Sequence, residues 1–159
     1  MRIEIIDNFL SEEECDYLIN FYNANKDIQK KYEINVNKFI KEIQITNIKE
    51  FKNLISKINN HVHMLNCEVD WINIVEWQEN CNQNLHRDLA SKDTVYSSIS
   101  YLNQDYIGGQ TFFEDGTIIS PKKGRSLFFD GVYFKHGVLE VKKPPRYTLA
   151  CWYKKISYE

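Results

Sequence analysis

The chain has 159 residues, which suffices for one domain with a hydrophobic core and is too few for two ordinary domains. Its formal net charge of −2 gives no overall attraction to nucleic acid or to an anionic membrane surface. No apolar run approaches the roughly 18 residues that span a bilayer, and the N-terminal segment lacks the apolar stretch of a signal peptide. We therefore expect a cytoplasmic monomer that engages neither nucleic acid nor a membrane.

The first elements are a strand and a helix. Residues 3–6 have the composition of a short strand, after which Asn8 or Ser11 begins a helix. Ser11 followed by Glu14 has the form of a capping box. The apolar stripe of this helix at helical spacing comprises Cys15, Leu18, Ile19 and Tyr22.

A strand and a second helix follow. Residues 37–45 alternate in polarity as a strand does, and Thr46 is expected to open the helix. One face of this helix carries Ile48, Phe51, Leu54, Ile55, Ile58, Val62 and Leu65. His61 and His63 lie two apart in it, so their side chains diverge by roughly 200° and cannot share a metal. We expect both histidines to be solvated or to lie at a rim.

From residue 69 onward the pattern changes to short β-branched and aromatic runs separated by glycine, proline and aspartate. These runs are VDWINIVEW, TVYSSISYLN, QTFFED, TIIS, RSLFFD, HGVLEV and RYTLACWY. Their number and spacing predict a β-sandwich or barrel, with the two early helices packed against it.

The four cysteines form no CxxC pair, which favours free thiols over disulfides. They are Cys15, Cys67, Cys81 and Cys151.

The triplet His86-Arg87-Asp88 is a candidate metal motif. On an extended strand, residues two apart point to the same face, so an imidazole and a carboxylate meet at one point while Arg87 turns toward solvent. By itself this spacing is a weak signal, and Asp88 as an ordinary turn residue is the alternative.

His136 and Arg146 strengthen the case for a metal site. Two histidines and one carboxylate form the facial triad of non-haem Fe(II) oxygenases, which leaves three coordination positions open. A cation deeper in the barrel then suits a dicarboxylate co-substrate, which arginine binds in bidentate fashion. The alternative for Arg146 is a structural ion pair at a strand end.

Over nearly its whole length the sequence resembles the Fe(II)- and 2-oxoglutarate-dependent dioxygenases, in particular the prolyl 4-hydroxylase-like branch. The segments that carry the resemblance are IEIIDNFLSEEECDYLI, INIVEWQENCNQNLHRD, SISYLNQDYIGGQTFF and GRSLFFD…HGV…RYTLACWY. It implies a mainly β fold with N-terminal helices (α+β), a double-stranded β-helix (jelly-roll or cupin-like) barrel supported by two or more helices. Residues 1–159 would form a single domain, with helical support over about 1–66 and the jelly-roll core over about 67–155.

The resemblance implies that His86, Asp88 and His136 are the catalytic iron ligands and that Arg146 binds the distal carboxylate of 2-oxoglutarate. Four further positions match residues of the co-substrate pocket: Tyr101, Thr111, Trp152 and Trp77. At the last of these the family usually has a tyrosine, whereas an indole N–H is a donor only. The three aromatic residues have core packing as their alternative role.

The implied activity is hydroxylation of a C–H bond with Fe(II), 2-oxoglutarate and O2, releasing succinate and CO2, with ascorbate as an accessory cofactor. Peptidyl proline is the expected substrate, and a free amino acid or another small molecule is the alternative. Only LASKD separates Asp88 from the next strand, and residues 25–40, polar and without sign of a tight apolar pocket, are the other candidate lid. An iron site with so little cover should admit an extended peptide.

Three other functions are less favoured. A nucleic-acid demethylase of the same superfamily would carry a second arginine six residues after Arg146, where this chain has Trp152. A non-catalytic cupin-like metal-binding module would not need Arg146 beside a complete triad. A structural zinc site would use a fourth side chain, and no cysteine stands at ligand spacing from either motif.

Overall fold

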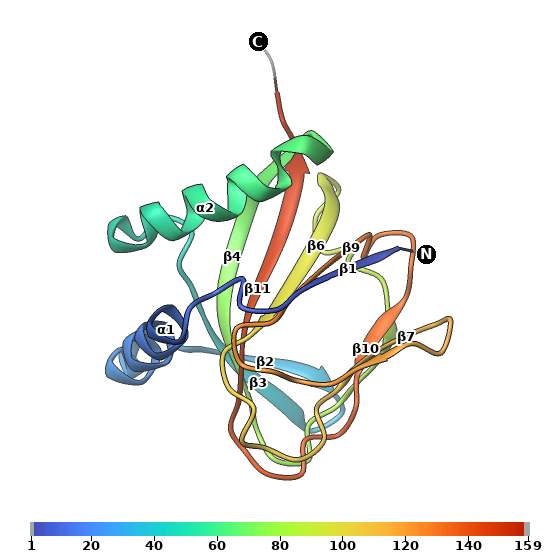
Figure 1. The fold of residues 1–159 in the computed structure, drawn as a ribbon. Coiled ribbons are helices and arrows are strands. Elements are labelled where there is room, and N and C mark those ends of the chain that lie inside the picture. Colours follow the sequence, from blue (N-terminus) through green and yellow to red (C-terminus); the bar gives the residue numbers. More distant parts are fainter. Residues whose placement is uncertain (1, 158–159) are drawn as a thin grey trace.

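Two antiparallel β-sheets form the framework of residues 2–157, the part of the chain that the computed structural model describes (Figure 1). The strands are β1 (Ile3–Ile6), β2 (Lys30–Asn35), β3 (Lys38–Gln44), β4 (Cys67–Trp77), β5 (Gln83–His86), β6 (Thr94–Tyr101), β7 (Thr111–Phe113), β8 (Ile118–Ile119), β9 (Ser126–Phe129), β10 (His136–Val138) and β11 (Arg146–Lys155). The larger sheet has the order β1-β9-β6-β11-β4-β3-β2, and the smaller has the order β5-β10-β7-β8. The predicted mainly β class with early helices is confirmed.

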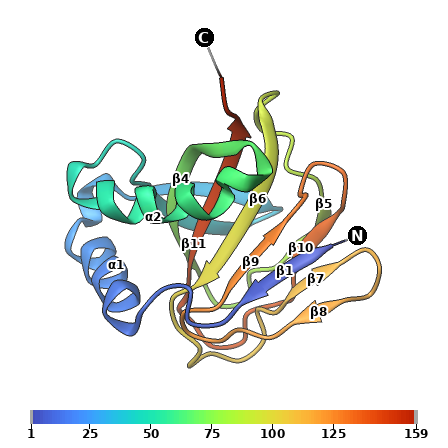
Figure 2. The ribbon, with the colours of Figure 1, turned by 45° about the horizontal axis from the view of Figure 1, so that its top comes forward.

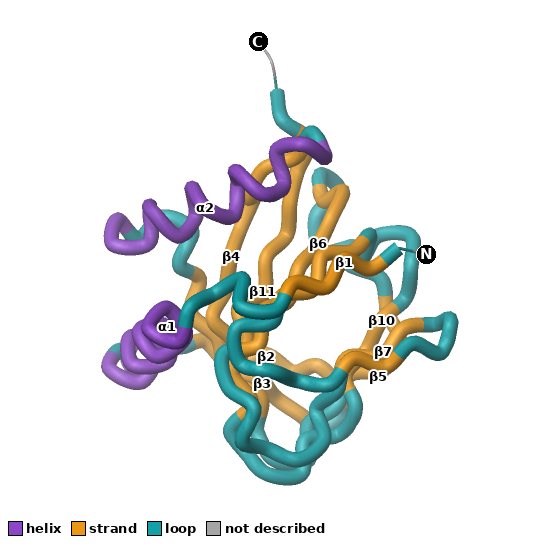
Figure 3. The backbone as a smooth tube through the Cα atoms, in the orientation of Figure 1, coloured by secondary structure: helices purple, strands orange, loops and turns teal. Residues whose placement is uncertain are grey.

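The helices cover one face of the larger sheet. They are α1 (Glu12–Ala24) and α2 (Lys52–Val62), accompanied by the 3-10 turns η1 (Lys26–Ile28), η2 (Lys49–Phe51) and η3 (His63–Leu65). Figures 2 and 3 show the helices on one side of the central strands β4, β11 and β6, with the smaller sheet on the other side. In the described residues, neither helix is long and apolar enough to cross a bilayer.

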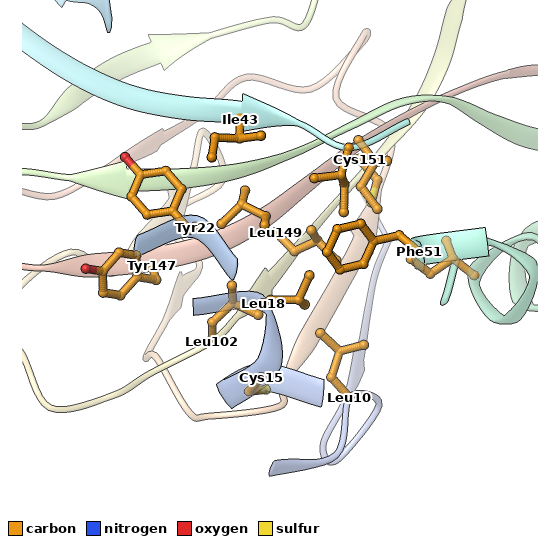
Figure 4. Packing of buried hydrophobic residues seen from close by; sticks show 14 of the residues in the cluster. Leu10, Cys15, Leu18, Tyr22, Ile43, Phe51, Leu102, Tyr147, Leu149 and Cys151 are labelled. Atoms are coloured by element: carbon orange, nitrogen blue, oxygen red, sulfur yellow. The ribbon is translucent and has the colours of Figure 1, made fainter. Parts of the chain in front are cut away.

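Helix α1 begins as its sequence predicts. The Ser11 N–H donates to Glu14 Oε1 at 2.9 Å, and the Glu14 N–H donates to Ser11 Oγ at 3.0 Å. This capping box satisfies two backbone donors at the helix start, a contribution of about 1 kcal/mol for the cap. Cys15, Leu18 and Tyr22 are buried against the sheet, as Figure 4 shows.

Helix α2 begins at Lys52, so the prediction that Thr46 opens it is wrong. The Thr46 hydroxyl accepts a hydrogen bond from the Ile72 N–H at 3.0 Å. This bond holds Thr46 against β4, and the helix begins only after it. Leu65, predicted on the apolar face, lies in η3 and is 49% exposed because the helix has already ended.

His61 is more than a rim residue. Its Nε2 lies 2.6 Å from Glu4 Oε1 and its ring centroid lies 4.4 Å from that of Phe128, so it joins α2 to β1 and β9. His63 is exposed, as predicted.

The central strands present two different faces. On β11, Tyr147, Leu149, Cys151 and Tyr153 belong to the core beneath the helices. Figure 4 shows the first three of them. The intervening residues Arg146, Thr148, Ala150 and Trp152 line a cavity on the opposite side. On β4, Ile72 and Ile74 join the core, while Trp71, Asn73, Val75 and Trp77 line the cavity. We refer to these as the helix face and the cavity face.

All four cysteines are buried and unpaired, which confirms the prediction of free thiols. Burial raises the pKa of Cys15 and Cys67 to about 11 and that of Cys151 to about 12, so these three remain protonated at neutral pH.

Candidate active site

A cavity of about 870 Å³ lies between the cavity face of the larger sheet and the smaller sheet. This volume is within the range of small-molecule and cofactor sites. All the predicted metal ligands line it, together with Arg146, Trp77 and Trp152. Arg87 is exposed, as predicted, and contributes to its lining.

His86, Asp88 and His136 meet in this cavity. Asp88 Oδ1 lies 3.6 Å from His86 Nε2 and 3.3 Å from His136 Nε2. The candidate ligand atoms all lie within 4.8 Å of one another, and residues 2–157 contain no other such group of three. The arrangement offers two imidazole nitrogens and one carboxylate oxygen from one side, which suits non-haem Fe(II).

Strand pairing brings the two histidines together. His86 is the last residue of β5 and His136 the first of β10, and the two are direct partners in the antiparallel ladder. Their ring centroids are 4.4 Å apart. Residues separated by 50 positions in sequence thereby become neighbours, as cross-strand pairs do.

Asp88 lies beyond the end of β5, and not on an extended strand as the spacing suggested. Its N–H donates to Gly131 O at 2.8 Å, and its Oδ2 accepts the Ser97 hydroxyl at 2.6 Å. A Cβ added at Gly131 would collide with Oδ2, so a small residue is needed there. With Oδ2 held by Ser97, Oδ1 is left to face the two histidines.

Backbone carbonyls orient both imidazoles. Nδ1 of His86 lies 2.8 Å from Asn84 O, and Nδ1 of His136 lies 3.4 Å from Phe134 O. A hydrogen on each Nδ1 would donate to these carbonyls and leave each Nε2 free as a metal ligand.

The electrostatics of the cluster keep Asp88 ionised. Burial by itself raises the pKa of this carboxyl, but the neighbouring imidazoles of His136 and His86 and the Ser97 hydroxyl outweigh burial and hold it well below its usual range. Burial lowers the pKa of His86, but the Asp88 carboxylate and the Asn84 carbonyl together more than offset burial, so the pKa of His86 is raised. The site is therefore an anionic carboxylate that attracts positive charge.

Arg146 is a buried cation without a counter-ion. It is 1% exposed, its Nε donates to Gly109 O at 2.9 Å, and its Nη2 has no hydrogen-bond partner. Among the described residues no carboxylate pairs with it within 4.0 Å. Because an isolated buried charge is costly, the geometry calls for an anion that is not part of this chain.

Two aromatic rings and Gly109 lie close to the Arg146 side chain. Its Cζ lies 5.0 Å from the Trp77 ring and 5.6 Å from the Tyr101 ring. Gly109 has a φ of +68°, and a Cβ there would lie 2.8 Å from Arg146 Cδ. Both the backbone conformation and the close approach therefore favour glycine at this position.

Tyr101 lies beside Arg146 and Thr111 lies beside Tyr101, and neither of the two lines the cavity. Their hydroxyls are 2.5 Å apart and fully buried. Trp152 lines the cavity, with its ring centroid 5.4 Å from that of Trp71. A direct contact of any of these residues, or of Trp77, with a co-substrate remains a prediction.

Sequence reasoning missed several residues of the site. Ser97 lies on the same strand face as Tyr101, which the sequence assigned to the co-substrate pocket, so strand alternation could have placed Ser97 near that pocket. Tyr106 has a buried hydroxyl without a hydrogen-bond partner. Burial raises its pKa, and the nearby charge of Arg146 partly offsets that rise. No pattern in the sequence distinguishes Tyr106 from a core tyrosine.

Residues 25–40 form a wall of the cavity. Strand β2, which the sequence did not predict, pairs with β3 to make a hairpin at one edge of the larger sheet. Ile34 and Ile40 pack against Val75, Trp77 and Val138 and line the cavity, so this predominantly polar segment also contributes apolar side chains to it. The loop between Asp88 and β6 is as short as predicted.

Comparisons with known proteins agree with this geometry. The profile of the 2OG-Fe(II) oxygenase superfamily matches residues 72–154, more than half of the chain. A search of curated proteins gave no match.

Several solved structures share the fold. The viral collagen prolyl hydroxylase of Paramecium bursaria Chlorella virus-1, in complex with 2OG, has 22% identity and a TM-score of 0.74, with 99% of this chain and 97% of that chain covered. A Pseudomonas putida prolyl-4-hydroxylase has 16% identity and a TM-score of 0.81, with coverages of 98% and 93%. A Trichoplax adhaerens prolyl hydroxylase in complex with a hypoxia inducible factor peptide has 19% identity and a TM-score of 0.78, with coverages of 96% and 83%. These likenesses show that the two sheets form the expected jelly roll.

Proposed function

Because the chain belongs to the 2OG-Fe(II) oxygenase superfamily, we propose that it is a hydroxylase whose iron is held by His86, Asp88 and His136. The family implies Fe(II), 2-oxoglutarate and O2. In this proposal residues 1–159 act as a single dioxygenase domain. The observation that carries it is the presence, in one cavity, of a three-ligand cluster and a buried arginine without a counter-ion.

The residues fit the metal. Two neutral imidazoles and one carboxylate provide the donor set of a facial triad, and an open cavity lies in front of them. Ser97 and Gly131 fix the carboxylate, and the carbonyls of Asn84 and Phe134 fix the rings. Such supporting contacts commonly account for 10- to 100-fold in metal affinity, roughly.

Arg146 fits the co-substrate. We assign it to the distal carboxylate of 2-oxoglutarate, which would supply the partner that Nη2 lacks. Tyr101, Thr111, Trp77 and Trp152 stay candidates for further contacts. A non-catalytic metal-binding module would have no use for this buried, unpaired guanidinium, so an enzyme is the better-supported proposal.

When bound together, the metal, 2-oxoglutarate and O2 supply an oxidant that inserts one oxygen atom into a substrate C–H bond, with succinate and CO2 as the other products. The chain itself holds the reactants and limits access of water. Val75, Phe129 and Val138 give the lining its apolar portion near the ligands. Ascorbate would serve as an accessory reductant.

For the substrate we propose a prolyl residue in a flexible peptide. The short loop after Asp88 and the exposed side chains of Tyr32, Leu89 and Ala90 in the cavity lining leave the site open to an extended chain. The prolyl hydroxylases named above share the fold, which is consistent with such a substrate. A free amino acid or another small molecule is the alternative, and a smaller, closed site would have favoured it.

The metal assignment is tested by His136→Ala, with His63→Ala as the control because His63 is an exposed histidine outside the site. We expect Fe(II)-dependent consumption of 2-oxoglutarate to be lost in the first variant and kept in the second. Metal should also raise the melting temperature of the wild type and of His63→Ala but not of His136→Ala, because binding to the native state stabilises it. Wild-type turnover by His136→Ala would disprove the assignment.

The substrate proposal is tested by incubating the enzyme with proline-containing peptides and with free proline. A product heavier by about 16 Da, the mass of one inserted oxygen, on peptidyl proline would support it. Robust turnover of free proline or of another small molecule, with no product on any peptide of a broad panel, would overturn it.

A further inference from the structure

The cavity contains a second polar region on β3 and β4, separate from the triad and from Arg146. Asn73 is only 6% exposed, and its Oδ1 has no hydrogen-bond partner. Asn73 and Glu42 both line the cavity. A buried amide oxygen without a partner is unfavourable, so this acceptor is suited to a donor on a molecule that enters the cavity.

Glu42 offers a second acceptor beside it. Its carboxylate forms no ion pair within the described residues, although Lys30 lies opposite it in the β2–β3 ladder. Burial raises its pKa, and a hydrogen bond from Asn73 and the charge of Lys30 only partly offset that effect. A cation brought to this point would therefore gain a partly desolvated partner.

Two indole rings extend the region toward the metal ligands. Trp71 and Trp152 are direct partners in the β4–β11 ladder, with ring centroids 5.4 Å apart and planes tilted by 36°. Across the next ladder Trp152 is paired with Ser97, whose hydroxyl holds Asp88. Indole faces attract ammonium and guanidinium groups.

The separation from the metal ligands suits a flanking group of a substrate. Asn73 pairs with Ala150 on β11, which pairs in turn with Ile99 on β6, the strand that carries Ser97. Two strand spacings amount to about 10 Å. An extended peptide advances about 3.3 Å per residue, so a long side chain on a neighbouring residue can reach across this distance.

We propose that Glu42, Asn73, Trp71 and Trp152 form a subsite for a basic group of the substrate, the ammonium of lysine or the guanidinium of arginine. This inference rests on the proposed function and specifies its substrate class. A neutral donor such as a backbone amide would satisfy Asn73 but would leave the Glu42 carboxylate without a charged partner. An acidic group would be repelled by Glu42.

The three tryptophans of the chain, Trp71, Trp77 and Trp152, all line the cavity, so intrinsic fluorescence reports binding there. The probes are blocked pentapeptides with one proline and, on either side of it, lysine, arginine, norleucine, glutamine or glutamate. Titrations without O2, with Fe(II) and 2-oxoglutarate present, measure affinity while no oxidation can proceed. We expect the lysine and arginine peptides to bind about tenfold more tightly than the norleucine and glutamine peptides, which corresponds to one partly buried charge pair.

The matched variants are Glu42→Gln and Glu33→Gln. Glu33 is an exposed acidic residue on β2 that also lines the cavity, so its substitution removes the same charge without touching the subsite. The preference for basic peptides should disappear in Glu42→Gln and persist in Glu33→Gln. Equal binding of all peptides by the wild type, binding of none, or an unchanged preference in Glu42→Gln would overturn the proposal.

Two further measurements distinguish the subsite proposal from the proposed oxygenase function. Consumption of 2-oxoglutarate without peptide tests the oxygenase function alone, so turnover combined with no preference for basic peptides would defeat only the subsite. A preference for basic peptides without any 2-oxoglutarate consumption would support the subsite and defeat the oxygenase. In turnover experiments, mass spectrometry locates the added oxygen on the proline or on the basic residue itself. Oxygen on the proline is expected, because the basic side chain then occupies the flanking subsite; oxygen on the basic residue would place that residue at the metal and overturn the subsite.

Discussion

The two faces of β11 are built differently although their residues alternate along one strand. On the helix face, Leu149 and Tyr153 are fully buried, and the Tyr153 hydroxyl is hydrogen bonded to Ser98 at 2.6 Å. On the cavity face, Arg146 is just as buried but keeps an Nη2 without a partner. Burial on the first face brings packing and satisfied polar groups, whereas burial on the second leaves capacity for a ligand.

Strand β4 repeats this division. Ile72 and Ile74 are completely buried in the core beneath the helices. Asn73 between them points to the cavity with its Oδ1 unsatisfied. Strand alternation thus lets one sheet support the fold with one face and line the candidate site with the other, and substitutions on the two faces should have separable effects.

The largest effect on stability is expected from Leu149→Ala on the helix face. Removing a fully buried leucine side chain should lower the free energy of unfolding by about 2–5 kcal/mol, through lost burial and the cavity left behind. Chemical denaturation measures this loss. Under conditions where the variant is folded, its affinity for 2-oxoglutarate should equal that of the wild type, and a large drop would mean that the two faces are coupled.

Arg146→Met on the cavity face should lower the affinity for 2-oxoglutarate without lowering stability, the reverse of what is expected for Leu149→Ala. Loss of the charged anchor should weaken 2-oxoglutarate binding by about 2–5 kcal/mol, seen as a higher apparent KM or Kd. The free energy of unfolding without ligand should be unchanged or higher, because a guanidinium with an unpaired Nη2 is replaced by an apolar side chain of similar length. Unaltered co-substrate affinity would contradict the assignment of Arg146, and strong destabilisation would make its role structural.

A smaller and more specific effect is expected from Ser97→Ala. The loss of its hydrogen bond to Asp88 Oδ2 should weaken metal binding by about tenfold, because supporting contacts orient metal ligands. Ser100→Ala is the matched control, since Ser100 is equally buried on β6 and bonds the Ser126 hydroxyl instead. Metal titration followed by melting temperature compares the two variants. Equal metal affinities for both would remove Ser97 from the site.

Much of the fold was predictable because its signals are local. The capping box at Ser11, the strand over residues 3–6 and the alternating runs of the second half depend on neighbouring residues and are found where expected. The start of α2 was not predictable, because Thr46 bonds to Ile72, a partner that is distant in sequence. Strand β2 was missed for a similar reason: its pairing with β3 and its place at the cavity decide its structure more than its polar composition does.

The sequence by itself determined which functional groups the candidate site can contain. These are two histidines, an aspartate and an arginine, in an order that resembles one enzyme family. Only the tertiary structure decided that these groups share a cavity, that Ser97 and Gly131 support Asp88, and that Arg146 is buried without a counter-ion. It also decided that Asn73 and Glu42, ordinary polar residues in the sequence, lie in that cavity. The reason is physical: residue type and local spacing fix which atoms can donate, accept or ligate. Strand register and burial determine which of those atoms meet and which are left unsatisfied.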